Sequence, residues 1–283
     1  MAPSFFNLPA VLDANHANGS HVERVLGPRQ NHVLHTHWRT LDDQSMSSSA
    51  LMDAFANDIP LVRQRGFLTP EECEKMLDIV KTHKIVGLHN DYFSGIKEAE
   101  SLQVRWKEEA GIDIMQRVAD SLGKTTGMPV RRAKEGEREY FAGVLRALDT
   151  GIQIHSDFAP YEGAGWEIGR VAAQLSWNIL LNKVPGGDTF IYDREWQAPE
   201  DDMAWRKEFP KYAYDPKVVE GRAIKVMSAV AGDLTFFNPR NFHEVRPCDV
   251  SKEAPTPMRF TVSSFVGYLP ASGCEPPTLV LWS

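Results

Sequence analysis

Residues 231–241 read Ala231-Gly232-Asp233-Leu234-Thr235-Phe236-Phe237-Asn238-Pro239-Arg240-Asn241, an apolar run between two turn sequences. Gly, Asp, Asn and Pro favour tight turns, through unusual backbone angles or hydrogen bonds from side chain to backbone. The run between the turns, 233–237, has the length and aromatic content of a buried strand. The same pattern recurs along the second half of the chain and predicts a fold dominated by strands.

Seven further segments have this character, and Gly, Pro or Asn separates them: 139–147, 151–156, 170–182, 188–192, 222–230, 258–268 and 277–282. Several short strands with such turn punctuation favour a sandwich or barrel. The segment 194–221 interrupts the strands and is rich in charged and aromatic residues. Insertions of this length in compact domains often form lids or binding loops.

Helices are predicted before the strands. One covers Ser47 to about Ala56, and a second begins at Thr69-Pro70-Glu71-Glu72, which combines a capping residue, proline and two acids. A third covers 112–122. The expected inward faces follow helical spacing: Cys73, Met76, Leu77 and Val80 in the second helix, and Ile114, Met115, Val118 and Leu122 in the third, which Gly123 or Gly127 ends.

This order of elements predicts a mainly β fold with flanking helices, a double-stranded β-helix of the jelly-roll or cupin-like type. Residues 1–45 are polar and are expected to form an N-terminal arm that packs on the domain or covers a site. Residues 46–283 are expected to form a single domain. It comprises a helical buttress (46–130), a barrel (138–283) and a lid-like insertion (194–221).

Composition narrows the class of protein. The 283 residues carry a formal charge of −7, which argues against a nucleic-acid partner. Three cysteines match no zinc pattern and indicate reduced thiols in an intracellular protein. The N-terminus does not resemble a signal peptide, and no run of eighteen apolar residues occurs, so we expect a cytoplasmic protein without a membrane span.

The segment 151–158 contains a candidate metal motif, His155-Ser156-Asp157. In a strand, residues 155 and 157 point to the same face, so an imidazole and a carboxylate can reach one ion. About one such pair is expected by chance in a chain with nine His and 38 acidic residues. The pair gains weight because His243, which follows the strand 233–237, is the only other histidine beyond residue 89.

Arg259 begins the run Arg259-Phe260-Thr261-Val262, sixteen residues after His243. Strand alternation places Arg259 and Thr261 on one face, opposite Phe260 and Val262. A guanidinium with a neighbouring hydroxyl on an inward face suits a buried carboxylate. Two histidines and one carboxylate on one side of an ion are typical of non-haem Fe(II) oxygenases.

The order His155-x-Asp157, His243, Arg259-x-Thr261 resembles the Fe(II)/2-oxoglutarate-dependent dioxygenase superfamily. One branch is closer. The chain is similar, over about 140–283, to the carrier-independent halogenases of hapalindole-type alkaloid pathways and to hydroxylases of N-acyl amino acids. This similarity lies in Gln174-Leu175-Ser176-Trp177, in 185–192 with Glu195-Trp196, in 232–238 and in Leu281-Trp282-Ser283.

The resemblance implies Fe(II) on His155, Asp157 and His243, with 2-oxoglutarate as co-substrate and its distal carboxylate on Arg259 and Thr261. The halogenases carry glycine where this chain has Asp157, and the missing carboxylate leaves them a site for chloride. Hydroxylation or a related oxidation is therefore expected here.

The family pattern also suggests residues around the pocket. Arg146 matches an arginine of the halogenases and is expected to face the cofactor or the substrate, although an outward strand charge explains it nearly as well. Aromatic side chains that could line the pocket, or belong to the plain core, are Phe158, Trp177, Tyr192 and Phe237.

The expected function is a 2-oxoglutarate-dependent non-haem iron oxygenase that uses O2 to hydroxylate an unactivated C–H bond. Its small-molecule substrate would be an amino-acid derivative or secondary metabolite. Desaturation, cyclisation or epimerisation in natural-product biosynthesis stays open on the same scaffold. A homodimer is also left open. An alternative of another class is a non-catalytic cupin-like protein that binds a metal or ligand. A metal on His32, His35 and His37 is a weaker alternative.

Overall fold

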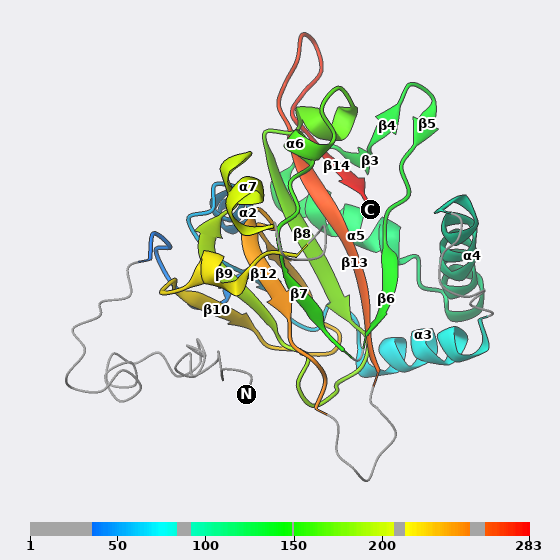
Figure 1. The fold of residues 1–283 in the computed structure, drawn as a ribbon. Helices are drawn as coiled ribbons and strands as arrows, with labels where there is room; N and C mark the ends of the chain where they lie inside the picture. The colour runs from blue at the N-terminus through cyan, green and yellow to red at the C-terminus, as the bar shows by residue number, and fades with distance from the viewer. Residues whose placement is uncertain (1–35, 84–91, 149, 207–212, 250–257) are drawn as a thin grey trace.

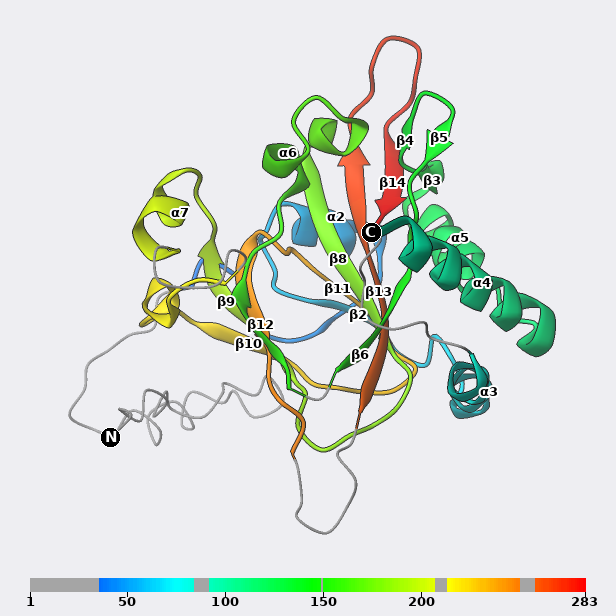
Figure 2. The ribbon, with the colours of Figure 1, turned by 45° about the vertical axis from the view of Figure 1, so that its right-hand side comes forward.

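The computed structural model describes residues 36–83, 92–148, 150–206, 213–249 and 258–283, and only the backbone of 92–95. Two β-sheets face each other, and helices cover the outer face of the larger one (Figures 1 and 2). The sheets are dominated by antiparallel pairs. The predicted mainly β fold with flanking helices, a double-stranded β-helix, is confirmed.

The larger sheet has eight strands. Seven form the path β1 (Gln44–Ser45), β2 (Val62–Gln64), β11 (Leu234–Phe237), β8 (Ala173–Leu180), β13 (Arg259–Leu269), β14 (Thr278–Trp282) and β3 (Val130–Arg132). The eighth, β6 (Val144–Leu148), pairs with the first half of β13, while β14 pairs with its second half. Both strands thus share one edge of β13.

The smaller sheet has the order β10 (Ile224–Met227), β9 (Thr189–Glu195), β12 (Asn241–Val245) and β7 (Ile152–His155). A separate hairpin joins β4 (Lys134–Glu135) to β5 (Arg138–Glu139). The strand predicted at 139–147 is therefore interrupted between β5 and β6. The strand predicted at 170–182 is shorter, because the 3-10 helix η1 (Glu167–Arg170) precedes it and β8 covers 173–180. β12 was not among the predicted strands.

Four helices form the helical layer: α2 (Ser48–Phe55), α3 (Pro70–Thr82), α4 (Tyr92–Ala110) and α5 (Ile114–Thr126). Thr69 caps α3 in a reciprocal capping box with Glu72, as its sequence indicates. The four inward residues predicted for α5 are all buried, and Gly127 ends the helix in the left-handed conformation. α4 was not predicted, but its Trp106 is fully buried and donates its indole N–H to the Met76 carbonyl at 3.1 Å.

The described part of the 194–221 insertion packs on the outer face of the smaller sheet. It contains α7 (Glu200–Trp205) and the 3-10 turn η2 (Pro216–Val219). Its apolar residues join Phe190, Tyr192 and Phe242 of β9 and β12 in one cluster. Residues 207–212 lie outside the described part, and the lid role stays a prediction.

The segment 36–45 packs against the barrel. Trp38 is buried with Leu61, Ile191, Met227 and Phe237. The histidines of residues 1–35 lie outside the described part, so of the alternative metal site only His37 can be placed. No helix in the described ranges is long and apolar enough to cross a membrane. A cytoplasmic location stays a prediction.

Candidate metal centre and cavity

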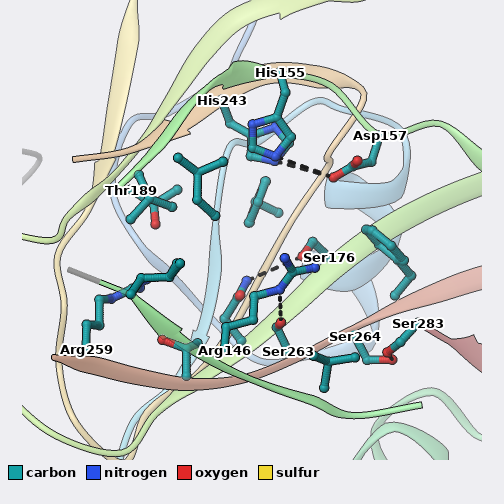
Figure 3. A pocket seen from close by; sticks show the side chains of 18 of the residues that line it. Arg146, His155, Asp157, Ser176, Thr189, His243, Arg259, Ser263, Ser264 and Ser283 are labelled. Atoms are coloured by element: carbon teal, nitrogen blue, oxygen red, sulfur yellow. Dashed lines mark hydrogen bonds and ion pairs between the residues drawn. The ribbon is translucent and has the colours of Figure 1, made fainter. Parts of the chain in front are cut away.

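His155 and His243 lie directly opposite each other on neighbouring strands. β7 and β12 are antiparallel, and their register pairs these two residues. The ring centroids are 4.1 Å apart, and Figure 3 shows both imidazoles at one end of the cavity, near Asp157. Residues 88 positions apart in the sequence thus reach one point because the smaller sheet pairs its first and fourth strands in chain order.

The backbone fixes the orientation of both rings. Nδ1 of His155 donates to the Gln153 carbonyl at 2.7 Å, and Nδ1 of His243 donates to the Asn241 carbonyl at 2.9 Å. Nε2 of each ring is thereby directed toward Asp157. Burial, with a smaller contribution from His155, holds the pKa of His243 well below its usual value. A neutral imidazole of this kind is the form that binds a metal ion.

Asp157 supplies the third donor. It follows β7, and its backbone N–H donates to the Pro239 carbonyl at 3.0 Å. Its Oδ2 lies 3.8 Å from Nε2 of His155 and 3.7 Å from Nε2 of His243. Two ligand atoms each about 2.1 Å from one ion are at most about 4.2 Å apart, so these separations suit a shared ion. Within the described ranges, this is the one group of three such residues close enough to hold a metal.

The three side chains border a cavity of about 460 Å³ between the two sheets. Other cavity residues, from both sheets and the adjoining loops, are Val144, Arg146, Leu148, Gly151, Ile152, Ser176, Asn178, Thr189, Phe237, Val245, Arg259, Thr261, Ser263, Ser264, Phe265 and Ser283. Polar residues dominate the wall on the side of the larger sheet (Figure 3).

Arg259 and Thr261 face this cavity from β13, as the strand alternation predicts, while Val262 belongs to the core on the other face. Both are buried, and Nε of Arg259 and Oγ1 of Thr261 have no hydrogen-bond partner among the described residues. A buried cation with unused donors is costly unless an anion pairs with it. The pair therefore fits a carboxylate that enters the cavity, such as that of 2-oxoglutarate.

Gly187 makes room for Arg259. Its φ is +75°, and a Cβ on it would lie 3.1 Å from Cδ of Arg259. A side chain at this position would be strained by the backbone and would also press on the arginine.

Arg146 reaches the cavity from β6, at the edge of the larger sheet. Its Nε donates to Oγ of Ser263 at 3.0 Å, and its guanidinium points into the cavity between the histidines and the larger sheet (Figure 3). Of the two alternatives left open for this residue, the geometry favours the inward one.

Of the four aromatic residues suggested for the pocket, one lines the cavity and three do not. Phe237 borders the cavity, and its ring lies edge-on to His243. Trp177 instead lies in the core beneath the helices, because it alternates with Ser176 and Asn178, which face the cavity. Tyr192 packs on the outer face of the smaller sheet.

Phe158 lies on that outer side too, packed against the same apolar cluster as Tyr192 and beneath the guanidinium of Arg240. The cavity is also lined by Ser176, Asn178, Ser263 and Thr189, which were not among the predicted pocket residues. Ser263 could have been found by extending the alternation of Arg259 and Thr261 by one step.

The fold and this site define a 2-oxoglutarate-dependent non-haem iron oxygenase. Residues 61–269 match the family of the carrier-protein-independent halogenase WelO5. The chain is 44% identical over 195 residues to leucinostatins biosynthesis cluster protein S of Purpureocillium lilacinum, across 68% of this chain and 79% of that protein. It is 29% identical over 192 residues to the L-γ-glutamyl-L-propargylglycine hydroxylase of Streptantibioticus cattleyicolor, across 66% of this chain and 65% of the hydroxylase.

Among solved structures, an N-substituted L-amino acid dioxygenase from Burkholderia ambifaria AMMD shares the fold. The TM-score is 0.53 at 14% identity, over 83% of this chain and 91% of that one. The chain belongs to the WelO5-type family of Fe(II)/2-oxoglutarate-dependent oxygenases. It is an oxygenase of natural-product biosynthesis, a hydroxylase or a halogenase. Membership of an enzyme family favours turnover over the non-catalytic cupin-like alternative.

Proposed function

We propose that this enzyme hydroxylates an unactivated C–H bond of a small molecule, such as an amino-acid derivative or another secondary metabolite. The observation that carries this proposal is Asp157, whose carboxylate stands within 3.8 Å of both imidazole nitrogens. In the halogenases this position is glycine, and chloride takes the vacant coordination site. A carboxylate there supports oxygen transfer over chlorination.

The residues have separate tasks in this proposal. His155, Asp157 and His243 would hold iron from one side, and bound Fe(II) with 2-oxoglutarate and O2 would supply the oxidising chemistry. Arg259 and Thr261 would bind the distal carboxylate of 2-oxoglutarate and so orient it. The walls of the two sheets would keep bulk water from the reacting atoms.

The cavity wall supports a polar substrate. Arg146, Asn178, Ser176 and Ser263 offer a cation, an amide and hydroxyls on the side of the larger sheet. A substrate with a carboxylate or amide groups can form hydrogen bonds with these side chains, whereas a plain hydrocarbon cannot. The hydroxylase of Streptantibioticus cattleyicolor and the dioxygenase of Burkholderia ambifaria are both named for amino-acid derivatives, which agrees with this class of substrate.

The test is anaerobic loading with Fe(II) and 2-oxoglutarate, followed by addition of O2 and a panel of N-acylated amino acids and peptides. We expect oxygen uptake, succinate formation and a product that gains one oxygen atom. A product in which chlorine replaces hydrogen when chloride is present would contradict hydroxylation. Protein that binds neither Fe(II) nor 2-oxoglutarate would contradict the whole proposal.

A matched variant, Asp157→Gly, separates the two chemistries. We expect it to lose hydroxylation because one ligand to the ion is removed. If its hydroxylation rate equals that of the wild type, the carboxylate has no part in the reaction.

A further inference from the structure

Asn57 lies deep in the protein behind the metal centre. It follows α2, it is 4% exposed, and its φ is +63°. Within the described ranges it is the only residue other than glycine with positive φ. Glycine would adopt this backbone more easily, so the asparagine side chain itself calls for an explanation.

That side chain is paired with a second buried amide. Nδ2 of Asn57 donates to Oδ1 of Asn241 at 3.1 Å, and Nδ2 of Asn241 donates to Oδ1 of Asn57 at 2.6 Å. Asn241 is fully buried. A reciprocal pair of this kind holds both side chains in one geometry, because breaking it leaves unpaired polar atoms in the interior.

Asn241 in turn orients His243. The backbone carbonyl of Asn241 accepts the Nδ1 hydrogen of His243 at 2.9 Å. The register of β12 with β9 shifts between Asn241 and His243, so the backbone is irregular at this point. Irregularities of this kind re-aim a side chain, and they need support because the regular ladder is interrupted. The Asn57 amide supplies that support through its two hydrogen bonds to the Asn241 side chain.

The network continues to the segment 36–45. Nε1 of Trp38 donates to Oδ1 of Asn57 at 3.2 Å, and Nε2 of His37 donates to its carbonyl at 2.9 Å. His37 also pairs with the carboxylate of Asp193 on β9. Hydrogen bonds thus join the N-terminal segment to Asn57 and Asn57 to the side chain of Asn241, whose own backbone carbonyl binds His243.

We propose that Asn57 is a positioning residue for the metal centre: through Asn241 it fixes the ring of His243, and it links the segment 36–45 to that ring. The proposal rests on the metal site of the proposed function. It places Asn57 outside contact with the ion, 2-oxoglutarate and the substrate, so its effect is on how the site is held.

The experiment uses Asn57→Gly in the full chain. Glycine accepts the positive φ, so the variant removes the amide and keeps the backbone geometry. We expect Fe(II) affinity, measured anaerobically, to fall by about 10-fold, the lower end of the range for losing a direct partner of a metal ligand, because Asn57 acts on His243 only through Asn241. Co(II) serves as a spectroscopic probe, and we expect its visible absorption bands to shift in position, since a changed ligand orientation alters the ligand field.

The control is Thr69→Ala, which removes the cap of α3 on the helical layer. It should lower the unfolding temperature and leave Fe(II) affinity and the Co(II) bands unchanged. Trp38→Phe keeps a smaller aromatic ring at this position and removes the indole N–H that donates to Asn57, so we expect a smaller loss of affinity than for Asn57→Gly.

Asn57→Gly with wild-type Fe(II) affinity and wild-type Co(II) bands would overturn the inference, and so would an equal loss of affinity in Thr69→Ala. Failure of the wild-type protein itself to bind Fe(II) would instead contradict the proposed function, so the two outcomes are distinguishable.

Discussion

The two candidate histidine ligands are arranged in the same way within their strands. Each donates its Nδ1 hydrogen to the carbonyl two residues earlier in the same strand. The strand backbone therefore sets the tautomer and directs Nε2 of each ring into the candidate metal centre. The orientation of these rings follows from local backbone geometry.

Replacing one of these rings tests this view directly. His155→Ala should lower Fe(II) affinity by more than about 100-fold, since loss of a direct ligand exceeds the effect of losing an outer partner. Anaerobic titration with Fe(II) measures it. His83→Ala, at the end of α3, is the matched control and should bind Fe(II) as the wild type does. Unchanged affinity in His155→Ala would remove this residue from the site.

The burial of Arg259 leads to a second prediction about a single residue. Arg259→Lys keeps the charge and loses the planar fork, so we expect the KM for 2-oxoglutarate to rise roughly 10–100-fold, equivalent to about 1.5–3 kcal/mol of a charged hydrogen bond. Succinate formation at varied 2-oxoglutarate concentration measures it. The exposed Arg222→Lys is the control, and an equal KM in both variants would contradict the role of Arg259.

Residue types and spacing predicted the triad and the inward face of β13, because alternation along a strand is a strong constraint. For Trp177 and Tyr192 the sequence left the pocket and the core open as alternatives. Each lies in a strand whose two faces are both covered by protein, so hydrophobicity does not reveal which face meets the cavity. The role of Asn57 could not be predicted from the sequence, because it depends on Asn241, a partner 184 positions away.

At the scale of elements, the start of β7 depends on a glycine. Gly151 has φ of +78°, and a Cβ on it would lie 2.4 Å from the carbonyl oxygen of Val245 and 2.8 Å from the nitrogen of Pro247. These are backbone atoms of the strand β12 and its continuation. Only glycine permits this close approach, which brings β7 alongside the strand that carries His243.

Gly151→Ala should accordingly destabilise the fold by at least about 1–3 kcal/mol, from backbone strain alone. Urea unfolding measures it. Gly136→Ala is the control, since it also has positive φ but meets no atom within 4 Å of its added Cβ. If both variants lose the same stability, the close approach to β12 contributes nothing.

Segments with clear cap or turn signals were predicted best. α3 begins, and α5 begins and ends, close to the predicted residues. β2 was missed because it has only three residues, and β12 was missed because it begins at Asn241, within the turn sequence 238–241. α4 was missed because its sequence mixes polar and apolar residues, and its burial depends on contacts with α3 and α5.

At the scale of the whole molecule, a buried ion network ties the N-terminal segment to both sheets. Lys225 of β10 is fully buried, and its Nζ contacts Oδ1 of Asp43 at 2.5 Å and the Leu41 carbonyl at 2.7 Å. Arg63 of β2 contacts Asp43 at 2.6 Å and Asp233 at 3.0 Å. One carboxylate thus balances two buried cations from different sheets.

Asp43→Asn leaves Lys225 without its counter-charge and should cost about 3–5 kcal/mol of stability. Urea unfolding at neutral pH measures it. The exposed neighbour Asp42→Asn is the control and should change stability by less than about 1 kcal/mol. Equal effects of the two substitutions would contradict the central role of Asp43.

The same carboxylate predicts a pH dependence. Burial raises the pKa of Asp43, but Lys225 and Arg63 outweigh burial and lower the pKa below its ordinary value of 3.8. A lowered folded-state pKa means that the stabilisation is present above about pH 4 and is lost as the pH falls through the folded-state pKa. Acid unfolding of the wild type should therefore include a component that Asp43→Asn lacks. Identical pH profiles below pH 4 would contradict this assignment.

The edge position of β7 has a consequence for how the protein loses its metal. Among the strands that the structure describes, β12 is the one neighbour of β7 in the smaller sheet, yet β7 bears His155, while β12 bears His243. An ion held by both rings would link β7 and β12 across the outermost ladder of hydrogen bonds. Fraying of β7 would separate the ring of His155 from that of His243 in one event. Release of the ion and slow amide-hydrogen exchange in β7 should therefore share a single rate.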